Sequence, residues 1–282
     1  MDNLIGMRIK RDIFFKARVN EPKLPAGLSF LKRFKLNSMY IVILAITFLS
    51  SLIVFAQQEK KEARILIVTG NDYPGHEWKK TTPALTNLLS QDKRLKIEVL
   101  YDPNKLGEVD LKRFDAVILH FMNWETTSPP IEARANLQNS VKEGKGLMLI
   151  HFACGAWQDW KEFRQIAGRV WNPKFRPHDP RGVFLVEITD REHPITRGLK
   201  DFQTDDELYT CLDGERPVHI IAKAKSKVDG KDYPMAFVFE YGRGRVFHTV
   251  LGHDVKAITN SAVPELFRRG CAWVAGLDPD LN

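Results

Sequence analysis

Two patterns of apolar and polar positions follow one another along the chain. In the first half, short unbroken apolar runs such as residues 65–68 are typical of strands buried on both faces of a sheet. Segments with helical spacing of apolar residues separate these runs. Strands that alternate with helices predict βαβ units and a parallel sheet. We expect strands at 64–69, 96–100, 115–120 and 146–151, and helices at 78–90, 130–143 and 157–167.

The second half is dominated by strand patterns. We expect strands at 183–188, 218–222, 235–240 and 245–250, and the last two flank the sequence YGRG, which is typical of a hairpin turn. A final helix is expected at 263–275. No internal repeat or linker follows residue 62, so the sequence predicts a single α/β domain over residues 57–282.

Positive charge gathers at the start of the chain. The formal net charge is +7, but residues 1–38 hold nine Lys and Arg against three Asp and Glu, and residues 39–56 carry no charge. The remaining sequence is therefore nearly neutral. A nearly neutral domain offers no electrostatic basis for binding nucleic acid, so we expect no nucleic-acid partner.

Residues 1–56 have the order of a secretory leader. A basic stretch at 32–35 precedes an apolar run, and Val54 and Ala56 place small residues before Gln57. The run, an h-region at about 39–55, is shorter than the ~20 apolar residues that a spanning helix needs. We expect a signal peptide, with an uncleaved anchor as the alternative. The domain is then secreted across the inner membrane, and is either periplasmic or held at the membrane by an uncleaved leader.

Polar and aromatic residues follow several of the expected strands. Ligands of an open parallel sheet bind beyond the carboxyl ends of its strands. Four expected strands are each followed by a histidine, at His76, His120, His151 and His253. Any one of them could be structural, but their shared edge predicts a small-molecule site, because imidazole can donate, accept or bind a metal. Tryptophans near the same edge could hold a sugar ring.

The number and the sequence context of the three cysteines favour neither a disulfide-stabilised fold nor thiol catalysis. They allow at most one disulfide, so the core must hold the domain together. A nucleophile elbow at Cys154 needs glycine two residues before and after it, where Phe152 and Ala156 stand. We therefore interpret Cys154 as a buried core residue. The sequence has no HExxH or paired CxxC motif. Ligands that come from separate loops produce no such motif, so the sequence neither predicts nor excludes a metal site.

Several ordered motifs carry a family resemblance. They lie at 69–76, 146–153, 193–199, 206–209 and 240–254. With these motifs, over residues 64–277, the chain resembles the ThuA-like family, named after trehalose utilisation. The resemblance implies a class I glutamine amidotransferase-like fold, which is a flavodoxin-like three-layer α/β sandwich with a mostly parallel central sheet. It also implies loss of the amidotransferase Cys-His-Glu machinery.

The resemblance also assigns candidate residues. Family members are tied to sugar metabolism, notably to 3-keto glycosides made by partner oxidoreductases. The candidate catalytic residues are His151, Glu207 and His253, and the substrate-binding candidates from the resemblance are His76, Tyr209 and Asp254. The residues that follow the expected strands add Trp78, Trp124 and Trp157 as substrate-binding candidates. The candidate ligands for a divalent metal such as zinc are His76, His151, His178 and His253.

We therefore expect an extracytoplasmic protein that cleaves glycosides, most plausibly 3-keto glucosides, by acid–base chemistry with or without a metal. A 3-keto group acidifies the hydrogen at C2, which His151 or His253 could remove, while Glu207 could protonate the leaving oxygen. A sugar or glycoside is the expected ligand, with a functional link to a sugar oxidoreductase. The alternatives are a sugar-binding protein without catalysis and a thiol hydrolase that uses Cys154, and glutamine amidotransferase activity is not expected.

Overall fold

The computed structural model describes residues 62–71, 73–124 and 126–280. The predicted leader and signal peptide at 1–56 lie outside these residues. None of the helices among the described residues is long and apolar enough to cross a membrane.

A nine-stranded sheet runs through the centre of the domain in the order β2-β1-β3-β4-β9-β8-β7-β5-β6. The first five strands in this order pair in parallel, and the remaining pairs are antiparallel. The prediction of a mostly parallel sheet is therefore wrong, and the sheet is mixed. The short connections from β7 to β8 and from β8 to β9 force antiparallel pairing there, because a parallel pair needs a long crossover. The strands are β1 (Ala63–Val68), β2 (Leu95–Leu100), β3 (Ala116–Leu119), β4 (Gly146–Ile150), β5 (Gly182–Ile188), β6 (Phe202–Asp206), β7 (His219–Lys225), β8 (Asp232–Tyr241) and β9 (Gly244–Thr249).

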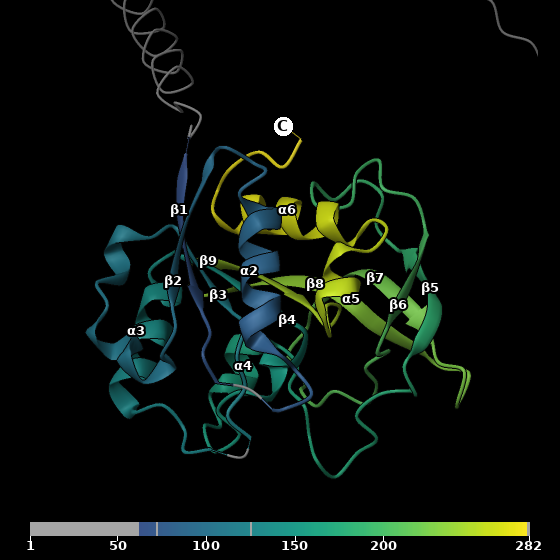
Figure 1. The fold of residues 1–282 in the computed structure, drawn as a ribbon, viewed down its shortest axis with the longest axis horizontal. Coiled ribbons are helices and arrows are strands. Elements are labelled where there is room, and N and C mark those ends of the chain that lie inside the picture. Colours follow the sequence, from purple (N-terminus) through teal and green to yellow (C-terminus); the bar gives the residue numbers. More distant parts are fainter. Residues whose placement is uncertain (1–61, 72, 125, 281–282) are drawn as a thin grey trace, which may run out of the picture. The chain divides into compact units, whose positions relative to one another are not determined.

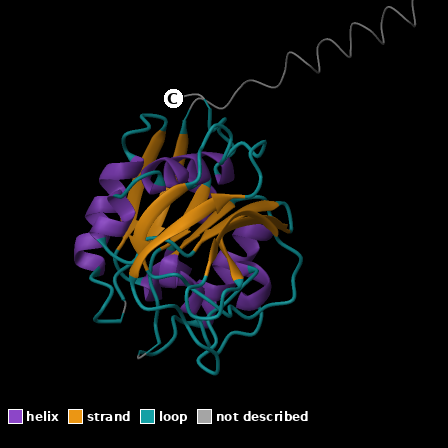
Figure 2. Cartoon of the chain, turned by 90° about the vertical axis from the view of Figure 1, so that its right-hand side faces the viewer, coloured by secondary structure: helices purple, strands orange, loops and turns teal. Residues whose placement is uncertain are grey.

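Helices cover both faces of the sheet and make the three layers that the family resemblance implies (Figures 1 and 2). One face packs against α2 (Trp78–Leu89), α5 (Val255–Thr259) and α6 (Val263–Val274). The other packs against α3 (Ile131–Lys142) and α4 (Phe163–Ala167). Three short 3₁₀ helices complete the helical elements, at η1 (Pro103–Glu108), η2 (Leu111–Arg113) and η3 (His151–Gly155).

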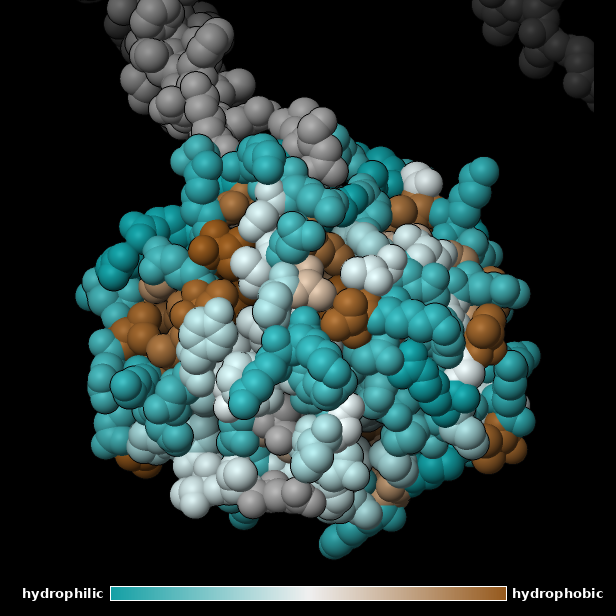
Figure 3. All heavy atoms as spheres, viewed as in Figure 1, coloured by the Kyte–Doolittle hydropathy of each residue, from teal (hydrophilic) through white to brown (hydrophobic). Residues whose placement is uncertain are grey.

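The inner parallel strands β1, β3 and β4 are buried on both faces, as their apolar runs predict. Along β1, Ile65 and Ile67 face the core beneath α2 and α6, whereas Leu66 and Val68 face the core beneath α3 and α4. Side chains of a strand alternate between faces, so a strand covered on both sides must be apolar throughout. By contrast, the outer surface in Figure 3 is largely hydrophilic, with hydrophobic residues in separate patches.

Three elements differ from the expectation. The helix expected at 157–167 begins only at Phe163, because Trp157 has a φ of 47°, which a right-handed helix cannot contain. The strand β6 is not predicted, since two of its five residues are aspartates, which are depleted in strands. The short helix α5 is also not predicted; it begins at an N-cap, Asp254, whose side chain accepts a hydrogen bond from the Ala257 amide.

Candidate functional site

Three histidines meet beyond the carboxyl ends of β1, β4 and β9. His151 directly follows β4 and has a φ of 52°, so the chain turns sharply there. His253 follows β9 after Gly252, whose φ of 110° is one that glycine adopts readily. His76 comes from the loop between β1 and α2. Parallel neighbours end at the same edge of the sheet, and this brings residues from distant parts of the sequence together.

The hydrogen bond of His151 fixes which of its nitrogens faces the cluster. Its Nδ1 lies 2.8 Å from the carbonyl oxygen of Val250, an acceptor only. We therefore assign the proton to Nδ1, which leaves a lone pair on Nε2. That Nε2 lies 3.2 Å from Nε2 of His76 and 3.3 Å from Nδ1 of His253.

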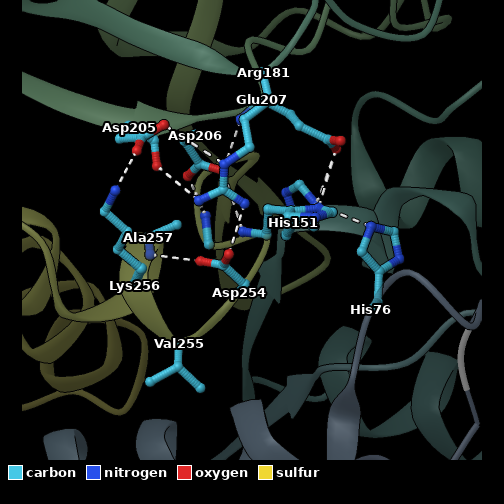
Figure 4. Close-up of polar contacts among 12 residues, drawn as sticks. His76, His151, Arg181, Asp205, Asp206, Glu207, Asp254, Val255, Lys256 and Ala257 are labelled. Atoms are coloured by element: carbon cyan, nitrogen blue, oxygen red, sulfur yellow. Dashed lines mark hydrogen bonds and ion pairs between the residues drawn. The ribbon is translucent and has the colours of Figure 1, made fainter.

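Glu207 joins the histidines with its carboxylate. Its Oε2 lies 3.2 Å from Nδ1 of His253 and 3.7 Å from Nε2 of His151. Figure 4 shows His76 and His151 pointing toward one another, with the carboxylate of Glu207 above the ring of His151. Four basic atoms thus converge on one small volume. We call His76, His151, Glu207 and His253 the His/Glu cluster.

Asp206 connects the two segments that carry Glu207 and His253. Its buried carboxylate accepts backbone hydrogen bonds from Gly252 at 2.7 Å, from Glu207 at 2.8 Å and from His253 at 3.2 Å. Burial raises the pKa of this carboxyl to about 6, although the three amides oppose the shift. The segment after β6 is therefore held against the loop after β9.

Charged pairs extend this connection toward the surface (Figure 4). Arg181 donates to Asp254 at 2.6 Å and lies 3.5 Å from Asp205, which also binds Lys256 at 2.5 Å. Arg181 thereby bridges the residues next to Glu207 and His253. It draws the side chain of Asp254 away from the cluster, where that carboxylate also caps α5.

The surroundings of the cluster shift the pKa values of its members in different directions. Burial lowers the pKa of His151 well below its ordinary value, and neighbouring histidines lower it further, so this ring is neutral at pH 7. Burial opposes the charges of His253 and Glu207, but their hydrogen bond prevails; it raises the pKa of His253 and lowers that of Glu207. Without a metal, their hydrogen bond therefore favours the ion-paired form of His253 and Glu207 beside a neutral imidazole.

The same atoms fit a divalent metal. One ligand atom from each member of the His/Glu cluster lies within 4.8 Å of the others. Tetrahedral zinc with bonds of about 2.0–2.1 Å places neighbouring ligand atoms about 3.3 Å apart. Four of the separations in the cluster are 3.2, 3.2, 3.3 and 3.7 Å. Imidazole and carboxylate are zinc ligands, and the Val250 carbonyl orients His151 as an outer partner orients a ligand.

The structure brings most of the predicted polar residues together. His76, His151, Glu207 and His253 form the cluster, but Glu207 and not His178 completes the metal-ligand group. His178 lies beside it, with Nε2 3.8 Å from Glu207. Tyr209 is buried against His151, with ring centroids 4.9 Å apart.

The three predicted tryptophans differ in exposure and position. Trp124 is 48% exposed near the cluster, whereas Trp157 is 1% exposed and packs against Phe121 and Phe163 in the core. The prediction of Trp157 as a substrate-binding residue therefore conflicts with its position, since its bulk fills the core beside α4. Trp78 begins α2 and, with Tyr73 and His76, lines a 310 Å³ pocket.

Asp206 and Arg181 are not among the site residues that the sequence predicts, and His120 is predicted at the shared edge without a catalytic, binding or ligand role. His120 is buried against Thr81, 2.9 Å away, and lines a small cavity together with three cluster histidines. Asp206 belongs to the acidic run 205–207, a pattern that is also typical of an exposed turn, so the sequence carries no signal for its buried position. Cys154 is buried, and burial raises the pKa of its thiol to about 12, which suits a core residue rather than a nucleophile.

Known proteins resemble this chain in sequence and in fold. The family model ThuA, described as trehalose utilisation, matches residues 64–274. A thua-like protein from Parabacteroides merdae superimposes with a TM-score of 0.68 at 24% identity, covering 76% of this chain and 90% of that one. A thua-like protein from Bacteroides uniformis gives 0.61 at 18% identity, covering 80% and 97%. A β-galactosidase from Bacillus circulans gives 0.52 at 13% identity, covering 80% of this chain and 33% of that one. No match was found among curated proteins.

Proposed function

Because the chain belongs to the ThuA family, described as trehalose utilisation, its role is related to carbohydrates, and we propose that it cleaves glycosides at the His/Glu cluster. The proposed substrates are 3-keto glucosides. One observation carries the proposal: a neutral, buried imidazole at His151 lies beside the pair of His253 and Glu207, whose Nδ1 and Oε2 are 3.2 Å apart. Groups whose environments drive their pKa values apart are typical of paired acid and base roles.

The chain's own residues can move the protons that such a cleavage needs. Nε2 of His151 takes the C2 hydrogen as a proton, and the electrons of the C–H bond form a C1=C2 double bond. The bond from C1 to the leaving oxygen breaks with its electron pair on that oxygen. The leaving oxygen then takes a proton from His253, whose charged form Glu207 stabilises.

A divalent metal held by the four cluster residues would supply Lewis-acid polarisation of the ketone oxygen. A nitrogen that binds a metal cannot also take a proton. Chelation therefore distinguishes the two roles of His151. If activity survives EDTA, His151 acts as the base that takes the C2 proton. If EDTA abolishes activity, His151 acts as a metal ligand.

A turnover assay tests the proposal. Residues 57–282 are incubated with matched glucosides in native and 3-keto forms, with and without EDTA, and the released aglycone is read by mass spectrometry. We expect release from the 3-keto forms alone. His151→Gln and Glu207→Gln should each lower turnover by about 10²–10⁴-fold, the range of general acid–base catalysis. His219→Gln is the matched control, since this exposed histidine pairs with Asp190 away from the cluster. Release from no glycoside would reject the proposal.

A second function is favoured by the exposed ring of Trp124 near the cluster. A sugar-binding protein without catalysis would show saturable binding, no product, and sensitivity to loss of Trp124 rather than of His151. We also propose that the domain acts outside the cytoplasm, on products of a sugar oxidoreductase. The basic and apolar order of residues 32–56 supports the location, which cell fractionation of the full-length chain would test.

A further inference from the structure

Five rings form a closed circuit that starts and ends at the His/Glu cluster. His76 contacts Tyr73 and Phe152, with centroids 6.0 and 5.1 Å apart. Tyr73 contacts Trp124 at 5.7 Å, and Trp124 contacts Trp171 at 5.0 Å. Trp171 returns to Phe152 at 5.2 Å. Such separations are those of favourable aromatic pairs. We call Tyr73, Trp124, Trp171 and Phe152 the aromatic wall.

The aromatic wall is buried on one side and exposed on the other. Phe152 and Trp171 are 8% and 7% exposed, whereas Tyr73 and Trp124 are 41% and 48% exposed. The inner pair supports the outer pair, which therefore presents two large ring surfaces to solvent beside the cluster. Exposed aromatic area next to a polar centre is typical of a ligand subsite rather than of an ordinary surface.

Hydrogen bonds tie the two loops that carry the outer rings. The backbone amide of Met122 donates to the carbonyl oxygen of Asn71 at 3.1 Å. The side-chain amide of Asn71 donates to Thr126 at 2.5 Å. The amide of Trp124 lies 3.2 Å from the sulfur of Met122. The outer rings are thus positioned before any ligand binds, which lowers the entropic cost of binding.

One buried donor in the wall has no partner. Nε1 of Trp171 is buried, and no acceptor for it lies within the described residues. A buried donor left unpaired is costly, and an ordered water is the usual partner of such an atom. Trp171 lies on the inner side of the wall, where it supports the exposed rings.

We propose that the aromatic wall is the subsite for a ring-shaped aglycone, with the reacting sugar at the His/Glu cluster. This inference rests on the proposed function for the position of the reacting sugar. It adds that the substrate class is glycosides whose leaving group is itself a ring, aryl or pyranose, in preference to small alkyl glycosides. The aglycone lies toward solvent on Tyr73 and Trp124, and the sugar lies deeper at His151.

The test measures binding, so that it does not depend on cleavage. Phenyl and methyl glucosides of both anomers, in native and 3-keto forms, are titrated calorimetrically into residues 57–282 with EDTA present. We expect phenyl glucosides to bind more tightly than methyl glucosides. Trp124→Ala and Tyr73→Ala should each weaken phenyl glucoside binding by about 2- to 13-fold, the worth of one aromatic contact, and leave methyl glucoside binding unchanged. Trp124→Phe should restore most of the loss.

Tyr101→Ala is the matched control, because Tyr101 is a 59% exposed aromatic that contacts Trp78 rather than the wall. Equal binding of phenyl and methyl glucosides to the wild type would overturn the inference, as would Trp124→Ala with unchanged phenyl glucoside binding. Tight phenyl glucoside binding without any release would reject the cleavage proposal and leave the subsite standing. Absence of binding by every glucoside would overturn both.

Discussion

Zinc should stabilise the domain through the His/Glu cluster, and the size of the effect can be estimated. Zinc at one hundred times its dissociation constant adds about 2.7 kcal/mol to the free energy of unfolding. A domain of this size gains about 2–4 °C in Tm per kcal/mol, so the expected rise is about 5–11 °C. The ligand-atom separations of 3.2–3.7 Å leave little rearrangement to oppose it.

Single variants should remove this rise selectively. Metal-free protein is prepared with EDTA and desalted, and its Tm is followed by scanning fluorimetry as zinc is added, with stoichiometry from calorimetry. His151→Gln and Glu207→Gln each remove one of four ligands and should abolish most of the rise. His248→Gln is the control, since His248 is buried in β9 but bonds to the carbonyl oxygen of Ala167 outside the cluster.

The rise should also shrink as the pH falls. Zinc binds the neutral imidazole, and Glu207 raises the pKa of His253, so protons compete with the metal at this residue first. We expect a larger rise at pH 8 than at pH 5.5. A wild type whose Tm does not respond to zinc, or a His151→Gln variant that responds as strongly as the wild type, would refute the assignment of the cluster as a metal site.

Three further predictions concern the rest of the domain. Iodoacetamide at pH 8 should label the partly exposed Cys211 of the native protein and spare Cys154, because burial raises the pKa of the Cys154 thiol to about 12. Labelling of Cys154 in preference to Cys211, read by mass spectrometry, would show that Cys154 is reactive. In metal-free protein, burial raises the pKa of Asp206 from 3.8 to about 6, so folding favours its protonated form. The contribution of this group to the free energy of unfolding is therefore complete below about pH 3.8 and is lost as the pH rises through 6. The wild type should therefore lose up to about 3 kcal/mol relative to Asp206→Asn between pH 4 and 8 in urea titrations, and a constant difference would contradict this. Phe267→Ala should cost about 3–5 kcal/mol in unfolding free energy, because the ring is fully buried in the core. Tyr101→Ala at the surface should change it by less than about 0.5 kcal/mol, and similar costs for both would show that burial is misassigned.

The central strands and part of the site could be predicted from the sequence. The strands β1, β3 and β4 are recognisable because a strand covered on both faces has to be apolar at every position. Once these strands are taken as parallel neighbours, residues that follow them must meet at one edge. This reasoning placed His76, His151 and His253 at one site, and the structure shows them in contact.

Only the tertiary structure decided which acidic residue joins the three histidines and how the outer strands of the sheet pair. Glu207 follows β6, an outer strand of the sheet, and it reaches the histidines because Asp206 accepts amide hydrogen bonds from the loop after β9. Likewise, the apolar character of Trp157 suits a core and a sugar platform equally, and only packing against Phe163 settles it. Periodicity records whether a position is buried, whereas contacts between distant segments depend on pairing and loop geometry that no local pattern contains.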